Sequence, residues 1–266
     1  MLTAGRWQVD VLELGQARHP WSWVSPEPGA EEWMWSPINV VLARSTSETI
    51  LVDTGAGILG HWWPYEGLSC DLEGALERTG VAAREIDRIV LTHLDFDHVG
   101  GALSGSWPED LAPAFPGVPV VMHAAAAAAA RLGAEDEPLN AATRSVRLFE
   151  DSGLLVEATD SEVVPEFRLR AAPGHRPGHA IVKIGPPAND VVFLADTLHH
   201  RLHAAHPEWD AVADEDVELA LGTRRRLLAE AAARRVPVFA AHIPAEEALL
   251  VEADEATWRF KPYREG

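Results

Sequence analysis

The chain of 266 residues contains a single cysteine, Cys70. An intrachain disulfide needs two cysteines and a thiolate zinc cluster needs several, so the sequence excludes both. Any metal ion must therefore be held by histidine, aspartate and glutamate. Long apolar runs are also missing, because no stretch approaches the roughly 20 residues of a membrane span and the first residues lack a signal-peptide core. We therefore expect a cytoplasmic protein without a membrane partner.

Basic residues are scarce, with 22 lysines and arginines against 41 acidic residues, which gives a net charge of -19. Such a surface repels phosphate backbones and disfavours nucleic acid as a partner. The remaining composition, 47% hydrophobic and 24% charged, is ordinary for a globular protein. This length suits one large α/β domain or two small ones.

Potential metal ligands are concentrated in residues 93–98. This hexad contains His93, Asp95, Asp97 and His98, and it directly follows a strand-like run at 89–92. Unpaired polar groups at a buried strand end cost free energy, and a metal ion removes that cost by accepting their lone pairs. The hexad therefore predicts a metal site.

The pattern along the chain indicates an α/β protein. Strand-like runs occur in two groups with helices between or after them, which predicts a four-layer αββα sandwich in one domain spanning residues 1–266. The helix expected at 214–234 would place Arg224, Arg225 and Arg226 on its exposed part. The expected strands are 8–14, 38–43, 49–53, 89–92, 118–122, 154–157, 167–171, 180–184, 191–195 and 236–241, and the other main helices are 71–80 and the alanine-rich 124–132.

The segment from about 20 to 37 is expected to be an irregular N-terminal loop. It contains Trp21, Trp23, Trp33 and Trp35 among prolines and glycines, which is too much aromatic surface for a solvated linker. One interpretation is a loop that packs onto the domain or, if the protein forms a homodimer, onto the partner subunit. The other is a lid or an apolar wall of a substrate pocket, and the two are compatible.

Three further strand ends carry potential ligands. His175 follows the strand at 167–171, Asp196 follows 191–195, and His242 follows 236–241. Ligands delivered from several strand ends can form a rigid site at one sheet edge. A single buried histidine is more often an ordinary core residue, but four such strand ends are harder to explain in that way.

In order and spacing, these segments resemble the metallo-β-lactamase superfamily. The pattern consists of Thr92 to His98, Pro173-Gly174-His175, Ala195-Asp196 and Ala241-His242, and the resemblance runs from Val40 to His242. Residues 190–250 resemble the branch containing acyl-homoserine lactonases and organophosphate hydrolases.

The resemblance implies two divalent metal ions, zinc first, with iron or manganese as alternatives. It assigns His93, Asp95 and His175 to one metal, Asp97, His98 and His242 to the second, and Asp196 to both. Such a pair holds a bridging hydroxide and polarises a carbonyl or phosphoryl oxygen. Asp97 is then also placed to orient the hydroxide and pass a proton to the leaving group.

Asp95 departs from the pattern, because the family has a second histidine at this position. Aspartate still binds zinc, but two imidazoles and a carboxylate form a harder ligand set that also suits iron or manganese. The alternative is that Asp95 points away and the first metal site is weak. Metal identity and activity therefore depend most on this residue.

Three residues outside the ligand set are candidates for supporting roles. The resemblance suggests His199 as a hydrogen-bond donor or acid facing the substrate carbonyl, whereas the nearby His200 and His203 are expected to be surface residues. Asp53 and His179 are candidates for orienting the ligands by hydrogen bonds, as metal sites generally require. A local turn or strand cap is an equally good explanation for these two.

The function implied is that of a metal-dependent hydrolase, lactonase-like or esterase-like, acting on small neutral esters, lactones or phosphotriesters. A non-haem iron oxidoreductase on the same fold, similar to a persulfide dioxygenase, is the alternative, and Asp95 lends it some weight. A non-catalytic metal-binding module is the third possibility.

Overall fold

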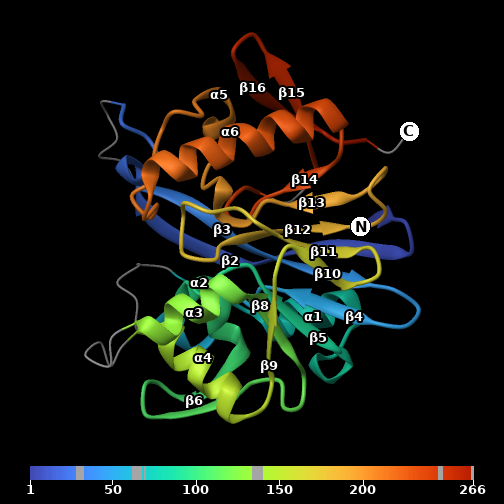
Figure 1. Cartoon of the computed structure of the whole chain (residues 1–266), viewed down its shortest axis with the longest axis vertical. Coiled ribbons are helices and arrows are strands. Elements are labelled where there is room, and N and C mark those ends of the chain that lie inside the picture. Colours follow the sequence, from blue (N-terminus) through green and yellow to red (C-terminus); the bar gives the residue numbers. More distant parts are fainter. Residues whose placement is uncertain (28–32, 62–67, 69, 134–139, 245–247, 265–266) are drawn as a thin grey trace.

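The computed structural model describes residues 1–27, 33–61, 68, 70–133, 140–244 and 248–264. Two seven-stranded sheets lie face to face, with helices on both outer sides (Figure 1). Part of the predicted tryptophan-rich loop, residues 28–32, lies outside the described residues.

The first sheet holds the N-terminal half of the chain. Its strands pair antiparallel from β1 to β4 and parallel from β4 through β5 and β8 to β9. Ile50, Leu51 and Val52 are all fully buried, as expected for a strand covered on both faces. In spatial order the strands are β1 (Leu2–Ala4), β2 (Trp7–Pro20), β3 (Trp33–Arg44), β4 (Thr49–Val52), β5 (Arg88–Leu91), β8 (Val120–His123) and β9 (Leu155–Ala158).

The second sheet is formed by the C-terminal half. Its pairs are antiparallel except for the parallel pair β13 and β14. A separate two-stranded sheet joins β6 (Leu103–Ser106) to β7 (Asp110–Pro113). The strands of the second sheet are β10 (Ser161–Val164), β11 (Phe167–Ala171), β12 (Ala180–Ile184), β13 (Val191–Phe193), β14 (Val238–Phe239), β15 (Leu249–Asp254) and β16 (Thr257–Pro262).

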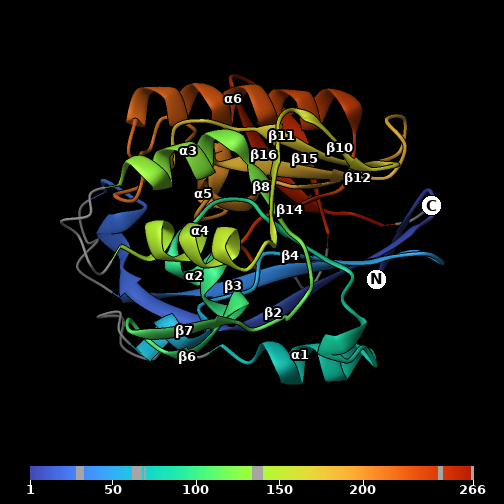
Figure 2. The same ribbon diagram turned by 60° about the horizontal axis from the view of Figure 1, so that its bottom comes forward.

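The helices α6 and α1 lie on opposite outer sides of the molecule (Figure 2). The chain has α1 (Leu72–Thr79), α2 (Phe96–Val99), α3 (Ala124–Leu132), α4 (Ala141–Asp151), α5 (Leu202–Ala205) and α6 (Val217–Arg234). Short 3-10 helices are η1 (Trp21–Trp23), η2 (Gly57–His61), η3 (Ala83–Glu85), η4 (Gly100–Ala102) and η5 (Ala195–Thr197). Among the described residues, no helix has both the length and the apolar character needed to cross a bilayer.

Three apolar clusters separate the four layers. One joins the first sheet to α1, α3 and α4 and includes Phe149. The second lies between the sheets, where Trp7 meets Phe167 edge-on at a centroid distance of 5.6 Å. The third packs α6 on the second sheet through Leu228. The predicted four-layer αββα sandwich is therefore confirmed.

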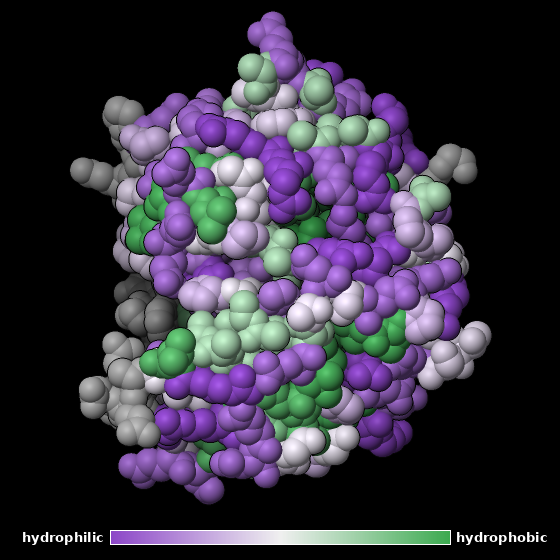
Figure 3. Space-filling view, in the orientation of Figure 1, coloured by the Kyte–Doolittle hydropathy of each residue, from purple (hydrophilic) through white to green (hydrophobic). Residues whose placement is uncertain are grey.

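Several details differ from the sequence-based expectations. β3 begins at Trp33, so the last part of the segment predicted as a loop is strand. β15 and β16 were not predicted, because charged residues interrupt their apolar pattern. Arg224 is 0% exposed, so the prediction that it lies on the exposed part of α6 is wrong, although Arg225 and Arg226 are exposed. The outer face shown in Figure 3 is mostly hydrophilic, with separate hydrophobic patches.

Gly174 allows the loop before His175 to lie against α6. Its φ is +126°, and a Cβ atom there would stand 2.2 Å from the backbone nitrogen of Ala220. We therefore expect Gly174→Ala to push this loop away from α6 and to destabilise the fold by about 1–3 kcal/mol, as overpacking does. Chemical denaturation measures this effect, and Gly222→Ala is the control, because a Cβ at that α6 position meets nothing within 4 Å. Equal stability of the two variants would contradict the close-packing argument.

Candidate metal centre

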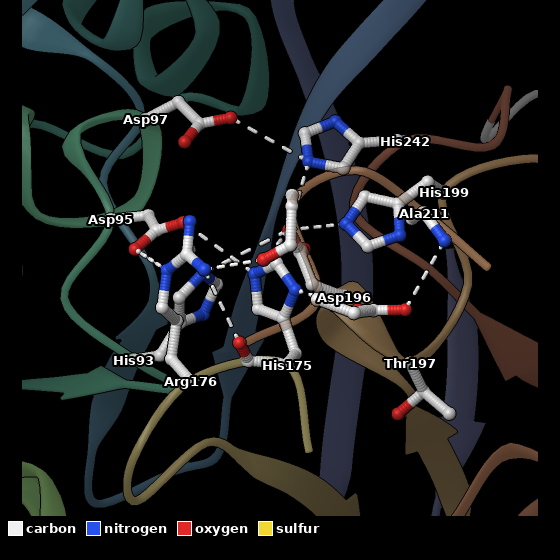
Figure 4. A network of polar contacts seen from close by, with 12 residues as sticks. His93, Asp95, Asp97, His175, Arg176, Asp196, Thr197, His199, Ala211 and His242 are labelled. Carbon is white, nitrogen blue, oxygen red and sulfur yellow. Dashed lines mark hydrogen bonds and ion pairs between the residues drawn. The ribbon is translucent and has the colours of Figure 1, made fainter. Parts of the chain in front are cut away.

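The potential ligands come from four strand ends that meet at one edge of the two sheets. His93 and Asp95 follow β5, and α2 supplies two more side chains of the hexad. His175 lies in the loop between β11 and β12, and Asp196 lies in η5 directly after β13. His242 follows β14. Figure 4 shows side chains from these segments pointing toward one another.

His93, Asp95 and His175 form one compact group. The Oδ2 atom of Asp95 lies 3.8 Å from Nε2 of His93 and 3.5 Å from Nε2 of His175. All three potential ligand atoms lie within 4.8 Å of one another. Asp95 thus points toward the group, and the alternative that it points away does not describe this structure.

Asp97, His98 and His242 form a second group of the same size. Asp97 lies between the two imidazoles, with Oδ1 3.9 Å from Nε2 of His98 and Oδ2 3.5 Å from Nε2 of His242. The hexad thus contributes to both groups, in the division that the family resemblance implies.

Asp196 lies between the two groups. Its carboxylate oxygens are 3.2 Å from Nε2 of both His98 and His242. The oxygen near His242, Oδ2, is also 3.5 Å from Nε2 of His175 and 3.8 Å from Nε2 of His93, whereas Oδ1 faces His98. The carboxylate therefore has the position expected for a group shared by two metal ions.

The chemistry of this donor set fits divalent metal ions. The Nε2 atoms of His93, His98 and His175 are buried and make no hydrogen bond, and neither does Oδ1 of Asp196. A buried polar atom without a partner costs about 1–3 kcal/mol. These atoms belong to groups that face one another, and imidazole with carboxylate is the set that zinc binds in the absence of thiolates. A cation bound between them removes the cost.

Electrostatics lead to the same conclusion. Burial would lower the pKa of His98 and of His242, yet the neighbouring carboxylates outweigh it and raise both. Burial would also lower the pKa of His175, but its hydrogen bond with Asp214 and the nearby carboxylates of Asp95 and Asp196 raise it to about 9. Burial raises the pKa of Asp97. The carboxylates therefore favour positive charge in this site, which bound cations would supply.

Two further carboxylates contact Nδ1 of two imidazoles, on the side of the ring away from Nε2. Asp53 places Oδ2 2.8 Å from Nδ1 of His98 and also accepts hydrogen bonds from the backbone and hydroxyl of Thr92. Asp214 places Oδ1 3.1 Å from Nδ1 of His175, and the buried Arg224 lies 3.5 Å from its other oxygen. Such partners fix the ring orientation and leave Nε2 free for a metal.

The sequence singled out Asp53 but missed Asp214 and Arg224. Asp214 lies in an acidic run just before α6, where an acidic residue is expected to cap or start a helix. The actual N-cap is Asp216, which leaves the Asp214 side chain free to turn toward His175. No local pattern distinguishes the two residues.

His179 supports the same region through the backbone. Its Nδ1 atom donates to the carbonyl of Ala172 at 2.7 Å, and its Nε2 atom accepts from the backbone N–H of Asp196 at 3.2 Å. The residue predicted as a possible supporting group therefore contacts the main chain that carries Asp196.

Removing Asp214 is expected to weaken metal binding. We expect Asp214→Ala to lower affinity for one metal ion by about 10–100-fold, because His175 loses the group that orients its ring. Competition with a chromophoric chelator measures this affinity. Asp210→Ala is the matched control, since Asp210 is exposed in the same loop. An unchanged affinity in Asp214→Ala would show that His175 does not need this partner.

His199 also reaches the centre. Its Nε2 atom lies 3.4 Å from Oδ2 of Asp196, and its ring stacks on that of His242 at a centroid distance of 5.8 Å. Neither ring nitrogen of His199 makes a hydrogen bond.

The expectation that His203 is a surface residue is wrong, because it is fully buried and bonds the carbonyl of Val24 through Nε2. His200 is half-buried beside Trp21.

A cavity of about 540 Å³ opens onto both ligand groups. Its walls are largely apolar, with Trp23 from the tryptophan-rich segment, Leu94 and Phe96 from the hexad, and small alanines from α3 and α4. Asp97 and His199 line it as well. The alanine run of α3 thus forms one wall of the pocket.

Comparisons with known proteins identify the family. Residues 33–242 match the metallo-beta-lactamase superfamily. The N-acyl homoserine lactonase AiiB of Agrobacterium fabrum is 35% identical over 77 residues, which cover 24% of this chain and 28% of that protein. An N-acyl homoserine lactonase of Bacillus cereus is 28% identical over 167 residues, or 63% of this chain and 60% of that protein. The matched parts thus span less than two thirds of either relative.

Solved structures share the fold over the whole chain. AidC, a dizinc quorum-quenching lactonase in complex with a product, has a TM-score of 0.83 at 20% identity, covering 100% of this chain and 97% of that one. The hydrolase AbOPH of the β-lactamase superfamily has a TM-score of 0.84 at 19% identity, with the same coverage. The family match and the candidate ligand groups fit a site for divalent metal ions. The chain belongs to the metallo-β-lactamase superfamily.

Proposed function

We propose that this protein hydrolyses small lactones or esters with two divalent metal ions, zinc first. His93, Asp95 and His175 would hold one ion, Asp97, His98 and His242 the other, and Asp196 would bind both. The observation that carries the proposal is the cluster of buried Nε2 atoms without hydrogen bonds around the Asp196 carboxylate. When bound, such metal ions polarise the substrate's carbonyl oxygen and lower the pKa of water.

Asp97 is proposed to transfer a proton to the leaving group. It lines the cavity and its side chain is 14% exposed, so a substrate can approach it. A carboxylate in this position can take a proton from the attacking water and pass it to the leaving oxygen.

The cavity supports a small neutral substrate. Its apolar walls can hold an acyl or alkyl group of such a substrate. The curated relatives are N-acyl homoserine lactonases, so lactones with an apolar substituent are the first class to test. Simple esters and phosphotriesters are the classes to test next.

A substrate panel tests this proposal. Metal-depleted protein is loaded with zinc, manganese, cobalt or iron and assayed on N-acyl homoserine lactones, other lactones, aryl esters and phosphotriesters. We expect turnover of lactones or esters with zinc or manganese. If no metal supports turnover of any member of the panel, the proposed function is wrong.

His199 is proposed as the hydrogen-bond donor to the substrate carbonyl. We expect His199→Phe to lower kcat by about 10²-fold or more while two zinc ions remain bound, because the loss of a positioned donor or acid costs at least this much. Turnover and metal analysis of the same samples measure both effects. His200→Gln, which changes a half-buried neighbour, is the control. Loss of a zinc ion in His199→Phe would make His199 a ligand, and unchanged kcat would remove it from the reaction.

A further inference from the structure

The two oxygens of Asp95 face different partners. Oδ2 points to the imidazoles of His93 and His175, at 3.8 and 3.5 Å. Oδ1 accepts a hydrogen bond from Nε of Arg176 at 2.7 Å. Figure 4 shows the guanidinium of Arg176 beside Asp95 and the two imidazoles. Only one oxygen is therefore directed to the position that a metal would share with the two histidines.

Both partners of this ion pair are held in place by other contacts. The backbone carbonyl of Asp95, the N-cap residue of α2, accepts from the N–H groups of His98 and Val99 in that helix. The guanidinium of Arg176 also donates through a terminal nitrogen to the carbonyls of His175 and Ala213. Rotation of the carboxylate would break the bond to Arg176, so the orientation of Oδ2 depends on this arginine.

Arg176 also offsets an excess of negative charge. The described residues that line the cavity include four acidic ones, Asp95, Asp97, Asp196 and Glu215, but only one arginine or lysine, Arg176. A histidine at position 95 would bring no charge when neutral, whereas aspartate brings one negative charge. A guanidinium in direct contact cancels it, so the centre keeps the net charge that a histidine would leave.

We infer that Asp95 and Arg176 act as one unit in place of the second histidine of the family motif. Arg176 is a positioning residue: it turns one oxygen of Asp95 toward the metal position and neutralises the charge that this carboxylate adds. The inference rests on the proposed role of His93, Asp95 and His175 as metal ligands. It adds a residue outside the motif on which that ligand set depends.

The unit has a consequence for substitutions. Asp95→His restores the family residue but leaves the guanidinium of Arg176 without its carboxylate beside two bound cations, and like charges at this distance repel. Asp95→His should therefore bind metal less well than the native pair. Removing the arginine charge at the same time should recover part of the loss, so the two substitutions are coupled.

The experiment measures zinc affinity, by chelator competition, for the native protein, Arg176→Gln, Arg176→Lys, Asp95→His and the double variant Asp95→His/Arg176→Gln. We expect Arg176→Gln to weaken one of the two zinc ions by about 10–100-fold, the effect of losing a group that orients a ligand. Arg176→Lys, which keeps the charge but loses the fork of donors, should lie between. The double variant should bind zinc more tightly than Asp95→His alone. Arg225→Gln on the exposed face of α6 is the matched control.

Cobalt absorption spectra of the same variants report ligand geometry without any assay of activity, and thermal unfolding identifies variants that fail to fold. A changed cobalt spectrum in folded Arg176→Gln or Arg176→Lys supports the unit. The inference is overturned if Arg176→Gln keeps native affinity for both ions, or if the effects of Asp95→His and Arg176→Gln simply add. Failure of the native protein to bind zinc at all would instead overturn the proposed function.

Discussion

Replacing Asp196 with asparagine is expected to lower turnover by about 10³-fold or more and to leave fewer than two zinc ions per chain. The carboxylate lies between the two ligand groups, 3.2 Å from His98 and His242 and 3.5 Å from His175. Asparagine keeps the shape of the side chain but removes the negative charge that would offset the two proposed divalent cations, and electrostatic stabilisation in such a site is a large part of catalysis. Steady-state kinetics and metal analysis measure the two effects.

Thr197→Val is the matched control for this variant. Thr197 is the next residue, it is buried, and its hydroxyl makes no hydrogen bond. A valine of the same shape should therefore leave turnover and zinc content unchanged. If Asp196→Asn also retains both, Asp196 does not bind the metals and the proposed arrangement of the site is wrong.

Removing the metal ions is expected to abolish turnover and to lower Tm by about 5–15 °C. A ligand that binds only the folded state stabilises it by about 2.7–4.1 kcal/mol at 100 to 1,000 times its Kd, and 1 kcal/mol corresponds to roughly 2–4 °C for a chain near this size. The physical reason is that the buried imidazoles and carboxylates lose their shared partner. Calorimetry of chelator-treated protein, before and after zinc is added back, measures the shift.

Asp196→Asn provides the comparison for this experiment. With part of the ligand set removed, its Tm should rise less when zinc is added than that of the native protein. A native Tm that does not respond to zinc would mean that the cluster is not a metal site of the folded state.

The sequence predicted the central parts of the fold well. Runs such as residues 89–91 and 180–182 are buried in sheets, and their continuous apolar character distinguishes them from surface segments. The turn after 44 and the helix ended by Gly80, which has a φ of 76°, follow local rules. Local patterns failed at β15 and β16, where a lysine and an arginine of β16 pair with a glutamate of β15.

For the site, order along the chain was more informative than periodicity. The strand ends that carry His93, His175 and His242 were recognisable because each places a polar residue after a buried run. Asp214 and Arg224 could not be recognised from the sequence, because their partners come from distant segments. An acidic residue before a helix and an arginine within one are also ordinary features of a helix, so neither stands out as part of a site. Arg224 donates to the carbonyl of Thr197 from within α6, a tertiary contact without a local signal.

Asp95 illustrates what the structure adds. The sequence left open whether this aspartate replaces a histidine ligand or turns away from the site. The structure directs one of its oxygens to His93 and His175 and the other to Arg176. Arg176, between His175 and Pro177 in the sequence, gave no signal of its own, because its role follows from the contact with Asp95.

The most direct test of the account is a zinc titration of metal-free protein during hydrolysis of a lactone. Each of the two ligand groups is expected to bind one ion, so lactone turnover should rise with added zinc and level off at about two equivalents per chain. Turnover that is independent of zinc, or a fully metal-loaded protein that hydrolyses no lactone or ester, would contradict it.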